Sequence, residues 1–192
     1  MKKLIQTLLR EELNNAFVKE VISGGEYIVY HGTNSNIEKF SDEFVGREEA
    51  VDQEGPGIYF TTLKKEAEIY GNNIYTVKLT PRKLMDTTLL NKNKWRLFTT
   101  KMLQAAPDWE DSAQNFHENP RRGLTLAVES MMEYNDTEKD LAQQIWYDFY
   151  RYKPVDFLRN IVKMGIDGII VPRHEGAGNH IIVYNPSIIH VQ

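Results

Sequence analysis

Cysteine is absent from the 192 residues of this chain, so disulfide bonds, thiolate metal sites and a cysteine nucleophile are all excluded. Long apolar runs are missing too, because no stretch approaches the roughly 20 residues that a membrane-spanning helix requires. An excess of positive charge is also lacking: 23 Lys and Arg stand against 27 Asp and Glu, for a net charge of -4. A generally basic surface for nucleic acid is therefore not indicated.

The first residues combine lysines with leucines, as a signal peptide does, but Arg10, Glu11 and Glu12 interrupt the apolar stretch. The leucines recur at helical spacing instead, which predicts an amphipathic helix over about residues 3–20. We therefore expect a cytoplasmic protein without a membrane partner. The 41% hydrophobic and 26% charged residues are ordinary for one globular domain, which we expect to span residues 1–192.

Segments rich in β-branched and aromatic residues lie at both ends of the chain and predict strands. They are residues 26–31, 57–61, 73–79, 84–86, 168–171, 180–184 and 188–191. A short helix is expected between them, capped by Thr62, running to Tyr70 and stopped by Gly71.

The middle of the chain, residues 92–164, has helical character and predicts an insertion between strands. Helices are expected over residues 94–105, 121–134, 137–152 and from Pro154 to Gly165, with a polar connection over 107–120. Strands at both ends with helices between them do not follow regular βα alternation, so the order favours an α+β fold.

Three short motifs carry the functional signal. The first is YHGT at 30–33, at the end of a strand, where Gly32 permits close approach to the backbone. The second is GPGIYFT at 55–61, followed by Ala67 and the Tyr70-Gly71 pair. The third is NHIIVYNP at 179–186. Taken alone, each motif also has a purely structural explanation: an ordinary strand end for the first, core tyrosines for the second, and a strand with an Asn-Pro turn for the third.

Taken in order, the motifs resemble the ADP-ribosyltransferase superfamily, in the branch of diphtheria toxin and the poly(ADP-ribose) polymerases. That branch has His-Gly-Thr/Ser, then Gly-x-Gly-Ile-Tyr-Phe with an Ala-x-x-Tyr helix end, then Asn-Glu-Tyr-Ile-Val-Tyr. The resemblance covers residues 26–79 and 163–191 and is greatest to small domains of phage and mobile-element proteins. It implies split antiparallel β-sheets with an NAD-binding cleft between them.

The resemblance also implies roles for individual residues. His31 would bind the adenosine ribose of NAD, and the backbone of Gly32 would hold the nicotinamide carboxamide. Tyr59 and Tyr70 would pack against the nicotinamide ring, and Thr33 would support the loop that follows.

The chain departs from the family where His180 stands at the position of the catalytic Glu. That carboxylate stabilises positive charge as the nicotinamide–ribose bond breaks, and a neutral imidazole supplies no negative charge. Glu175, in the glycine-rich turn EGAGN, is the first candidate to replace it. Glu48, Glu49 and Glu54, before GIYFT, are lower-ranked candidates.

Two functions follow as hypotheses. The first is a mono-ADP-ribosyltransferase that uses NAD as substrate and a macromolecular acceptor, with protein favoured over nucleic acid. The second is a catalytically degenerate module that binds NAD or a partner. No metal site is expected, because the five histidines form no ligand pair with carboxylate support.

Overall fold

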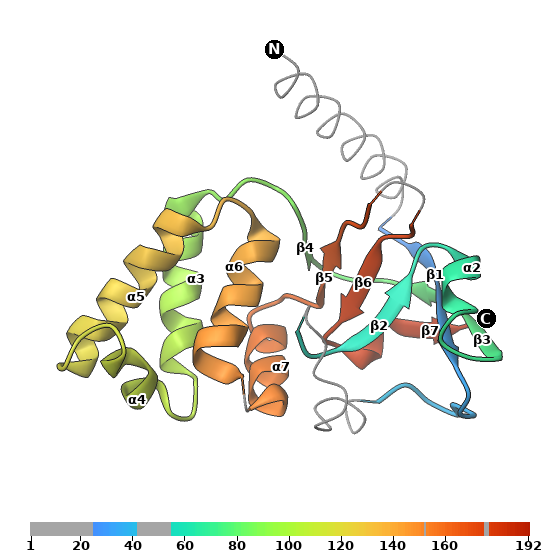
Figure 1. The fold of residues 1–192 in the computed structure, drawn as a ribbon, viewed down its shortest axis with the longest axis horizontal. Helices are drawn as coiled ribbons and strands as arrows, with labels where there is room; N and C mark the ends of the chain where they lie inside the picture. The colour runs from blue at the N-terminus through green and yellow to red at the C-terminus, as the bar shows by residue number, and fades with distance from the viewer. Residues whose placement is uncertain (1–24, 42–54, 152, 175–176) are drawn as a thin grey trace, which may run out of the picture.

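The computed structural model describes residues 25–41, 55–151, 153–174 and 177–192 of the chain. The helix predicted over residues 3–20 lies outside these described residues. A β-sheet and a block of helices lie side by side, with the helical block next to the β4–β5 side of the sheet (Figure 1).

Seven strands form one curled sheet in the order β4-β5-β6-β2-β1-β3-β7. Neighbouring strands are antiparallel except β4 and β5, which are parallel. The strands are β1 (Tyr27–Thr33), β2 (Ile58–Thr61), β3 (Asn73–Leu79), β4 (Leu84–Met85), β5 (Gly168–Val171), β6 (His180–Val183) and β7 (Ile189–Val191). The predicted α+β class is confirmed, and the predicted strands are all present.

The centre of this sheet is a weak seam. β1 and β2 are joined through a single residue pair, Tyr30 with Thr61, whereas β1 and β3 pair along seven residues. The sheet therefore consists of two well-paired groups, β4-β5-β6-β2 and β1-β3-β7. The split between two antiparallel sheets that the resemblance implies corresponds to this seam, although all seven strands belong to one hydrogen-bonded sheet.

The helical block contains α3 (Lys92–Gln104), α4 (Trp109–Gln114), α5 (Pro120–Tyr134), α6 (Glu138–Ile145) and α7 (Pro154–Lys163). Asn91, Asn119 and Thr137 each accept a backbone amide from the first turn of the helix that follows, so local caps begin three of them. The prediction of a polar connection over 107–120 is wrong, because α4 forms inside it. The predicted helix over 137–152 is α6 followed by a π-helical turn, η3 (Trp146–Tyr150).

The helix predicted from Thr62 to Tyr70 is shorter and begins differently. It is α2, Lys64–Ala67, and its N-cap residue is Leu63. Thr62 does not cap it, because its hydroxyl accepts the backbone amide of Asn179 at 3.0 Å. Gly71 has no positive φ, so it is no left-handed helix stop. A side chain on Gly71 would instead collide with the backbone of Thr33, only 2.1 Å away.

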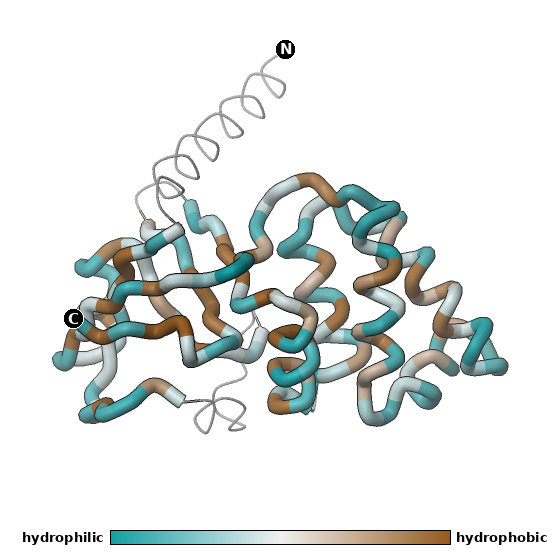
Figure 2. The backbone as a smooth tube through the Cα atoms, turned by 180° about the vertical axis from the view of Figure 1, so that it is seen from behind, coloured by the Kyte–Doolittle hydropathy of each residue, from teal (hydrophilic) through white to brown (hydrophobic). Residues whose placement is uncertain are grey.

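One hydrophobic core runs through the sheet and into the interior of the helical block. Hydrophobic residues run along much of the strands, whereas hydrophobic and hydrophilic residues alternate around the helices (Figure 2). Trp146, Phe149 and Tyr150 of η3 are buried in this core, so these aromatics pack rather than face a ligand. Burial raises the pKa of Tyr150 to about 12, and its hydroxyl donates to the carbonyl oxygen of Met102. None of the described helices is long and apolar enough to cross a membrane.

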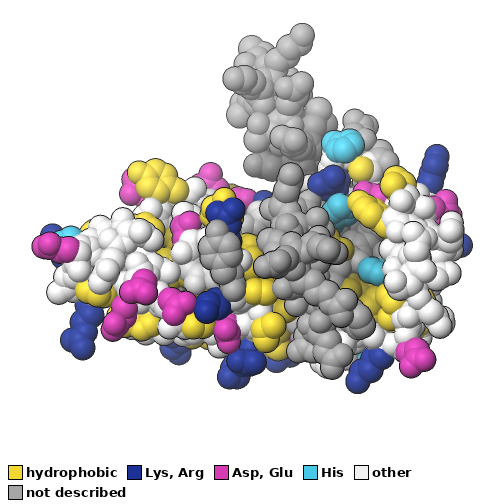
Figure 3. Space-filling view, turned by 60° about the horizontal axis from the view of Figure 1, so that its bottom comes forward, with side chains coloured by type: hydrophobic (Ala, Val, Ile, Leu, Met, Phe, Trp, Pro, Cys, Tyr) yellow, Lys and Arg dark blue, Asp and Glu magenta, His cyan; other side chains and the backbone are white. Residues whose placement is uncertain are grey.

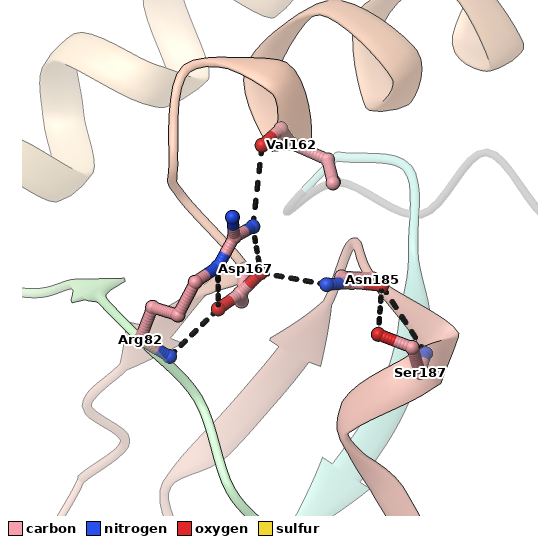
Figure 4. A network of polar contacts seen from close by, with 5 residues as sticks. All are labelled: Arg82, Val162, Asp167, Asn185 and Ser187. Carbon is pink, nitrogen blue, oxygen red and sulfur yellow. Dashed lines mark hydrogen bonds and ion pairs between the residues drawn. The ribbon is translucent and has the colours of Figure 1, made fainter.

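A buried carboxylate ties the sheet to α7 (Figure 4). Asp167, fully buried just before β5, accepts the backbone amide of Arg82 at 2.7 Å and the guanidinium of the same residue. It also accepts the side-chain amide of Asn185 at 2.8 Å, while Arg82 donates to the carbonyl oxygen of Val162 at 3.2 Å. This network fixes the ends of β5, β6 and α7, and thus the strand that bears His180.

Candidate functional site

The register of the central strands gathers three side chains of the second and third motifs. Thr61 on β2 lies directly opposite His180 on β6, so their side chains share one face of the sheet. Tyr59 precedes Thr61 by two residues and points to the same face. The rings of Tyr59 and His180 meet edge to face, with centroids 6.5 Å apart.

A carboxylate from a different element completes this group. Glu66, on α2, accepts the hydroxyl of Thr61 at 2.6 Å and the backbone amide of Gly178 at 2.9 Å with one oxygen. Its other oxygen lies 3.1 Å from Nε2 of His180, which makes an ion pair when the imidazole is protonated. The side chains of His180 and Glu66 are 11% and 15% exposed, so the pair is largely shielded from water.

The charge of Glu66 is maintained by these donors. Burial would raise the pKa of Glu66, but the hydrogen bonds from Thr61, His180 and Gly178 outweigh it. The pKa is therefore below its ordinary value, and the carboxylate is ionised at neutral pH. An ionised carboxylate from α2 therefore lies beside His180 on β6.

Glycines allow α2 to sit where Glu66 can reach His180. A side chain on Gly32 would place its Cβ 1.7 Å from the carbonyl oxygen of Ala67, so only glycine lets α2 pack this closely on β1. A Cβ on Gly178 would lie 2.3 Å from the hydroxyl of Thr61 and 2.7 Å from Glu66. The missing side chain at Gly32 therefore accommodates α2, and the expected contact of its backbone with nicotinamide stays a prediction.

His31 contacts the main chain of Tyr59 rather than its ring. Nδ1 of His31 donates to the carbonyl oxygen of Tyr59 at 2.8 Å, which fixes the tautomer of a neutral imidazole. The ring packs between Phe40 and Phe60, with centroids at 5.2 and 5.6 Å. Burial lowers the pKa of His31, partly opposed by the bond to Tyr59, so the imidazole is neutral at pH 7.

The two tyrosines of the expected sandwich differ in their surroundings. Tyr59 is half-buried and its hydroxyl donates to the carbonyl oxygen of Gly55 at 2.5 Å. Tyr70 is 57% exposed just after α2, and the described residues include no ring that contacts it. The packing of both rings against nicotinamide stays a prediction.

Of the remaining expected site residues, Thr33 supports the loop after β1, and the candidate glutamates lie outside the described residues. The hydroxyl of Thr33 accepts the backbone amide of Ser35 at 3.1 Å, which closes the turn after β1. Glu175, Glu48, Glu49 and Glu54 lie outside the described residues, so their candidacy is untested. Within the described ranges, no group of three or more His, Asp or Glu is placed to hold a metal ion.

Glu66 is the residue that sequence reasoning missed. Its only sequence signal is its place five residues after Thr61, inside a helix where a glutamate is usually a solvated surface residue. The contact with His180 joins residues 114 positions apart, and no local pattern reports it. Figure 3 shows histidine side chains on the sheet half of the molecule, while acidic and basic side chains are scattered over both halves.

Comparison with known proteins gives one family and one structural neighbour. Residues 23–190 match the family model described as ADP-ribosyltransferase in polyvalent proteins. No curated protein matches the chain. A solved structure described as the crystal structure of an anti-CRISPR protein is similar to 87% of this chain and 94% of its own, with 13% identity and a TM-score of 0.36.

Proposed function

Because the chain belongs to the family of ADP-ribosyltransferases in polyvalent proteins, we propose that it binds NAD beside Tyr59 and His180 and transfers one ADP-ribose. The observation that carries this proposal is the ionised carboxylate of Glu66, held against His180 and Thr61. It supplies the negative charge that the sequence lacks at position 180.

The chemistry needs that charge at one moment. The bond between C1′ of the ribose and the nicotinamide nitrogen breaks, and nicotinamide leaves with the bonding electrons. Positive charge then develops on the ribose until an acceptor nucleophile forms a bond to C1′ and loses its proton. When the His180 imidazole is neutral, the His180–Glu66 pair has a net charge of -1 and would stabilise that transition state, whereas a protonated imidazole would cancel this charge.

The binding roles follow the family pattern, as part of the same proposal. Tyr59 packs against the nicotinamide ring, Tyr70 closes over it from the exposed side, and the backbone of Gly32 holds the carboxamide. His31 is neutral and donates through Nδ1 to Tyr59, so Nε2 is the nitrogen left to accept from a ribose hydroxyl.

We expect a single ADP-ribose to be transferred. In the family, elongation depends on a carboxylate that engages the incoming ribose hydroxyl from the position of His180. Here the carboxylate of Glu66 already accepts from Thr61, Gly178 and His180. The proposed acceptor is a protein, consistent with the net charge of -4, which disfavours general nucleic-acid binding.

The test compares NAD cleavage and label transfer in the parent and three variants. Glu66→Gln keeps the shape and removes the charge, so we expect a loss of about 10²–10³ in rate with NAD affinity retained. Glu68→Gln, an exposed change two residues away, is the matched control and should behave like the parent. Glu175→Gln tests the candidate that the sequence favoured, and a loss confined to that variant assigns the carboxylate to the turn.

One observation favours the second function, a module that binds NAD or a partner without catalysis. Both oxygens of Glu66 are satisfied within the protein, as in a purely structural carboxylate. This second function predicts no cleavage by the parent and no gain in His180→Glu, with saturable NAD binding if NAD is the ligand of the module. Brisk cleavage that survives Glu66→Gln and Glu175→Gln would contradict the proposed charge role.

A further inference from the structure

The helical block contains a pocket of its own. It measures about 600 Å³ and lies between α3, α4 and α5. Its lining comes from Arg96 on α3, Trp109 on α4 and Arg121 on α5, among other side chains. The pocket belongs to the insertion, on the far side of the helical block from the strands that bear Tyr59 and His180 (Figure 1).

The pocket is positively charged although the chain is acidic overall. No acidic side chain lines it, and neither arginine forms an ion pair with any described residue. An arginine whose five N–H donors have no carboxylate partner is suited to bind an anion in bidentate geometry. The local charge therefore predicts an anionic ligand.

The two arginines lie at opposite ends of the pocket. α3 and α5 run antiparallel in Figure 1, so the end of α3 lies near the beginning of α5. Gln104, the last residue of α3, and Trp109 therefore belong to the Arg121 end, while Arg96 lies two turns away. Eight residues of helix separate Arg96 from Gln104, a distance of about 12 Å.

The Arg121 end offers a stacking surface. Trp109 lines the pocket and is only partly buried, although it also packs against the hydrophobic core, whereas Trp95 and Trp146 are 4% and 5% exposed. An indole face stacks on a nucleobase with little base selectivity. The amide of Gln104 and the guanidinium of Arg121 are side chains that hydrogen-bond to base edges.

The middle of the pocket has hydroxyl acceptors above an apolar floor. Thr100 donates its proton to the carbonyl oxygen of Arg96, and Thr125 donates to that of Arg121. Each hydroxyl oxygen keeps lone pairs that can accept from sugar hydroxyls. Leu124 and Val128 are buried beneath.

We propose that this pocket binds a nucleoside phosphate, with its base on Trp109, its sugar between Thr100 and Thr125, and its phosphate on Arg96. Along about 12 Å of the pocket, an aromatic ring, hydroxyl groups and a guanidinium group follow one another in the same order as the base, sugar and phosphate of one nucleotide. The ligand is a free nucleotide or the phosphorylated end of a strand. This site is separate from the proposed NAD site and does not depend on it.

The experiment follows the tryptophan fluorescence of the full chain, which has three tryptophans, in titrations with adenosine, AMP, inorganic phosphate and a short 5′-phosphorylated oligonucleotide. We expect saturable quenching by AMP, weaker quenching by adenosine, and none by phosphate alone. Trp109→Phe should abolish the response, and Arg96→Ala should weaken AMP binding about tenfold or more. Tyr59→Ala should leave the titration unchanged.

Arg122→Ala is the matched control, because Arg122 is an exposed neighbour of Arg121 that does not line the pocket. Binding by AMP but not the oligonucleotide identifies a free nucleotide, and tighter binding of the oligonucleotide identifies a strand end. Equal losses in Arg96→Ala and Arg122→Ala would show nonspecific charge attraction and overturn the proposal. The absence of saturable quenching by both AMP and the oligonucleotide would overturn it as well.

Discussion

Replacing Gly32 by alanine tests how the sheet holds α2 and Glu66. The added Cβ would lie 1.7 Å from the carbonyl oxygen of Ala67, whereas real Cβ atoms essentially never come under 3.0 Å of another atom. α2 would therefore have to retreat from β1 by about 1.3 Å. Such overpacking costs about 1–3 kcal/mol of stability. For a domain of this size, each kcal/mol lowers the melting temperature by about 2–4 °C.

The same retreat affects the candidate site. The bond from Gly178 to Glu66 is 2.9 Å long, so a shift of this size directed away from Gly178 would take it beyond hydrogen-bonding distance. We expect Gly32→Ala to lose both thermal stability, measured by circular dichroism, and NAD cleavage. Ile28→Val, on the same strand at a side chain 47% exposed, is the control and should melt like the parent. A Gly32→Ala protein with the melting temperature and activity of the parent would refute the close packing of α2.

Three further changes probe single interactions. Tyr59→Phe removes the bond to Gly55, so we expect a loss of about 0.5–1.5 kcal/mol in denaturant unfolding with NAD affinity kept, whereas Tyr59→Ala should lose that affinity. Burial lowers the pKa of His31 in the folded protein, so the neutral imidazole leaves folding stability intact above the unfolded-state pKa of about 6.5, and stability is lost as the pH falls below that value. His31→Gln should therefore make the melting temperature depend less on pH between about pH 8 and 5. An unchanged pH dependence would contradict this. Burial would raise the pKa of Asp167, but the hydrogen bonds from Arg82 and Asn185 outweigh it and lower the pKa, so the stability that the carboxylate provides above about pH 4 is lost in acid. Asp167→Asn should have a lower melting temperature at neutral pH, and that temperature should fall less as the pH is lowered. A melting temperature that falls with pH as in the parent would count against the network.

The sequence by itself determined the family, the α+β class and the order of the elements. The YHGT, GIYFT and HIIVY segments form β1, β2 and β6, because alternating β-branched and aromatic residues favour strands locally. Pro120 and Pro154 begin helices, as their fixed φ predicts. The short helix α4 was missed because its six polar-rich residues carry little periodicity.

Only the tertiary structure decided which side chains meet. Glu66 and His180 are each ordinary in sequence, and they become neighbours because Gly32 lets α2 pack on β1 while β2 and β6 pair in the register that sets Thr61 opposite His180. Thr62 is a plausible helix cap by its neighbours, yet its hydroxyl bonds to Asn179 from the other end of the chain. Contacts across more than a hundred residues depend on strand pairing and close packing, which local propensity does not encode.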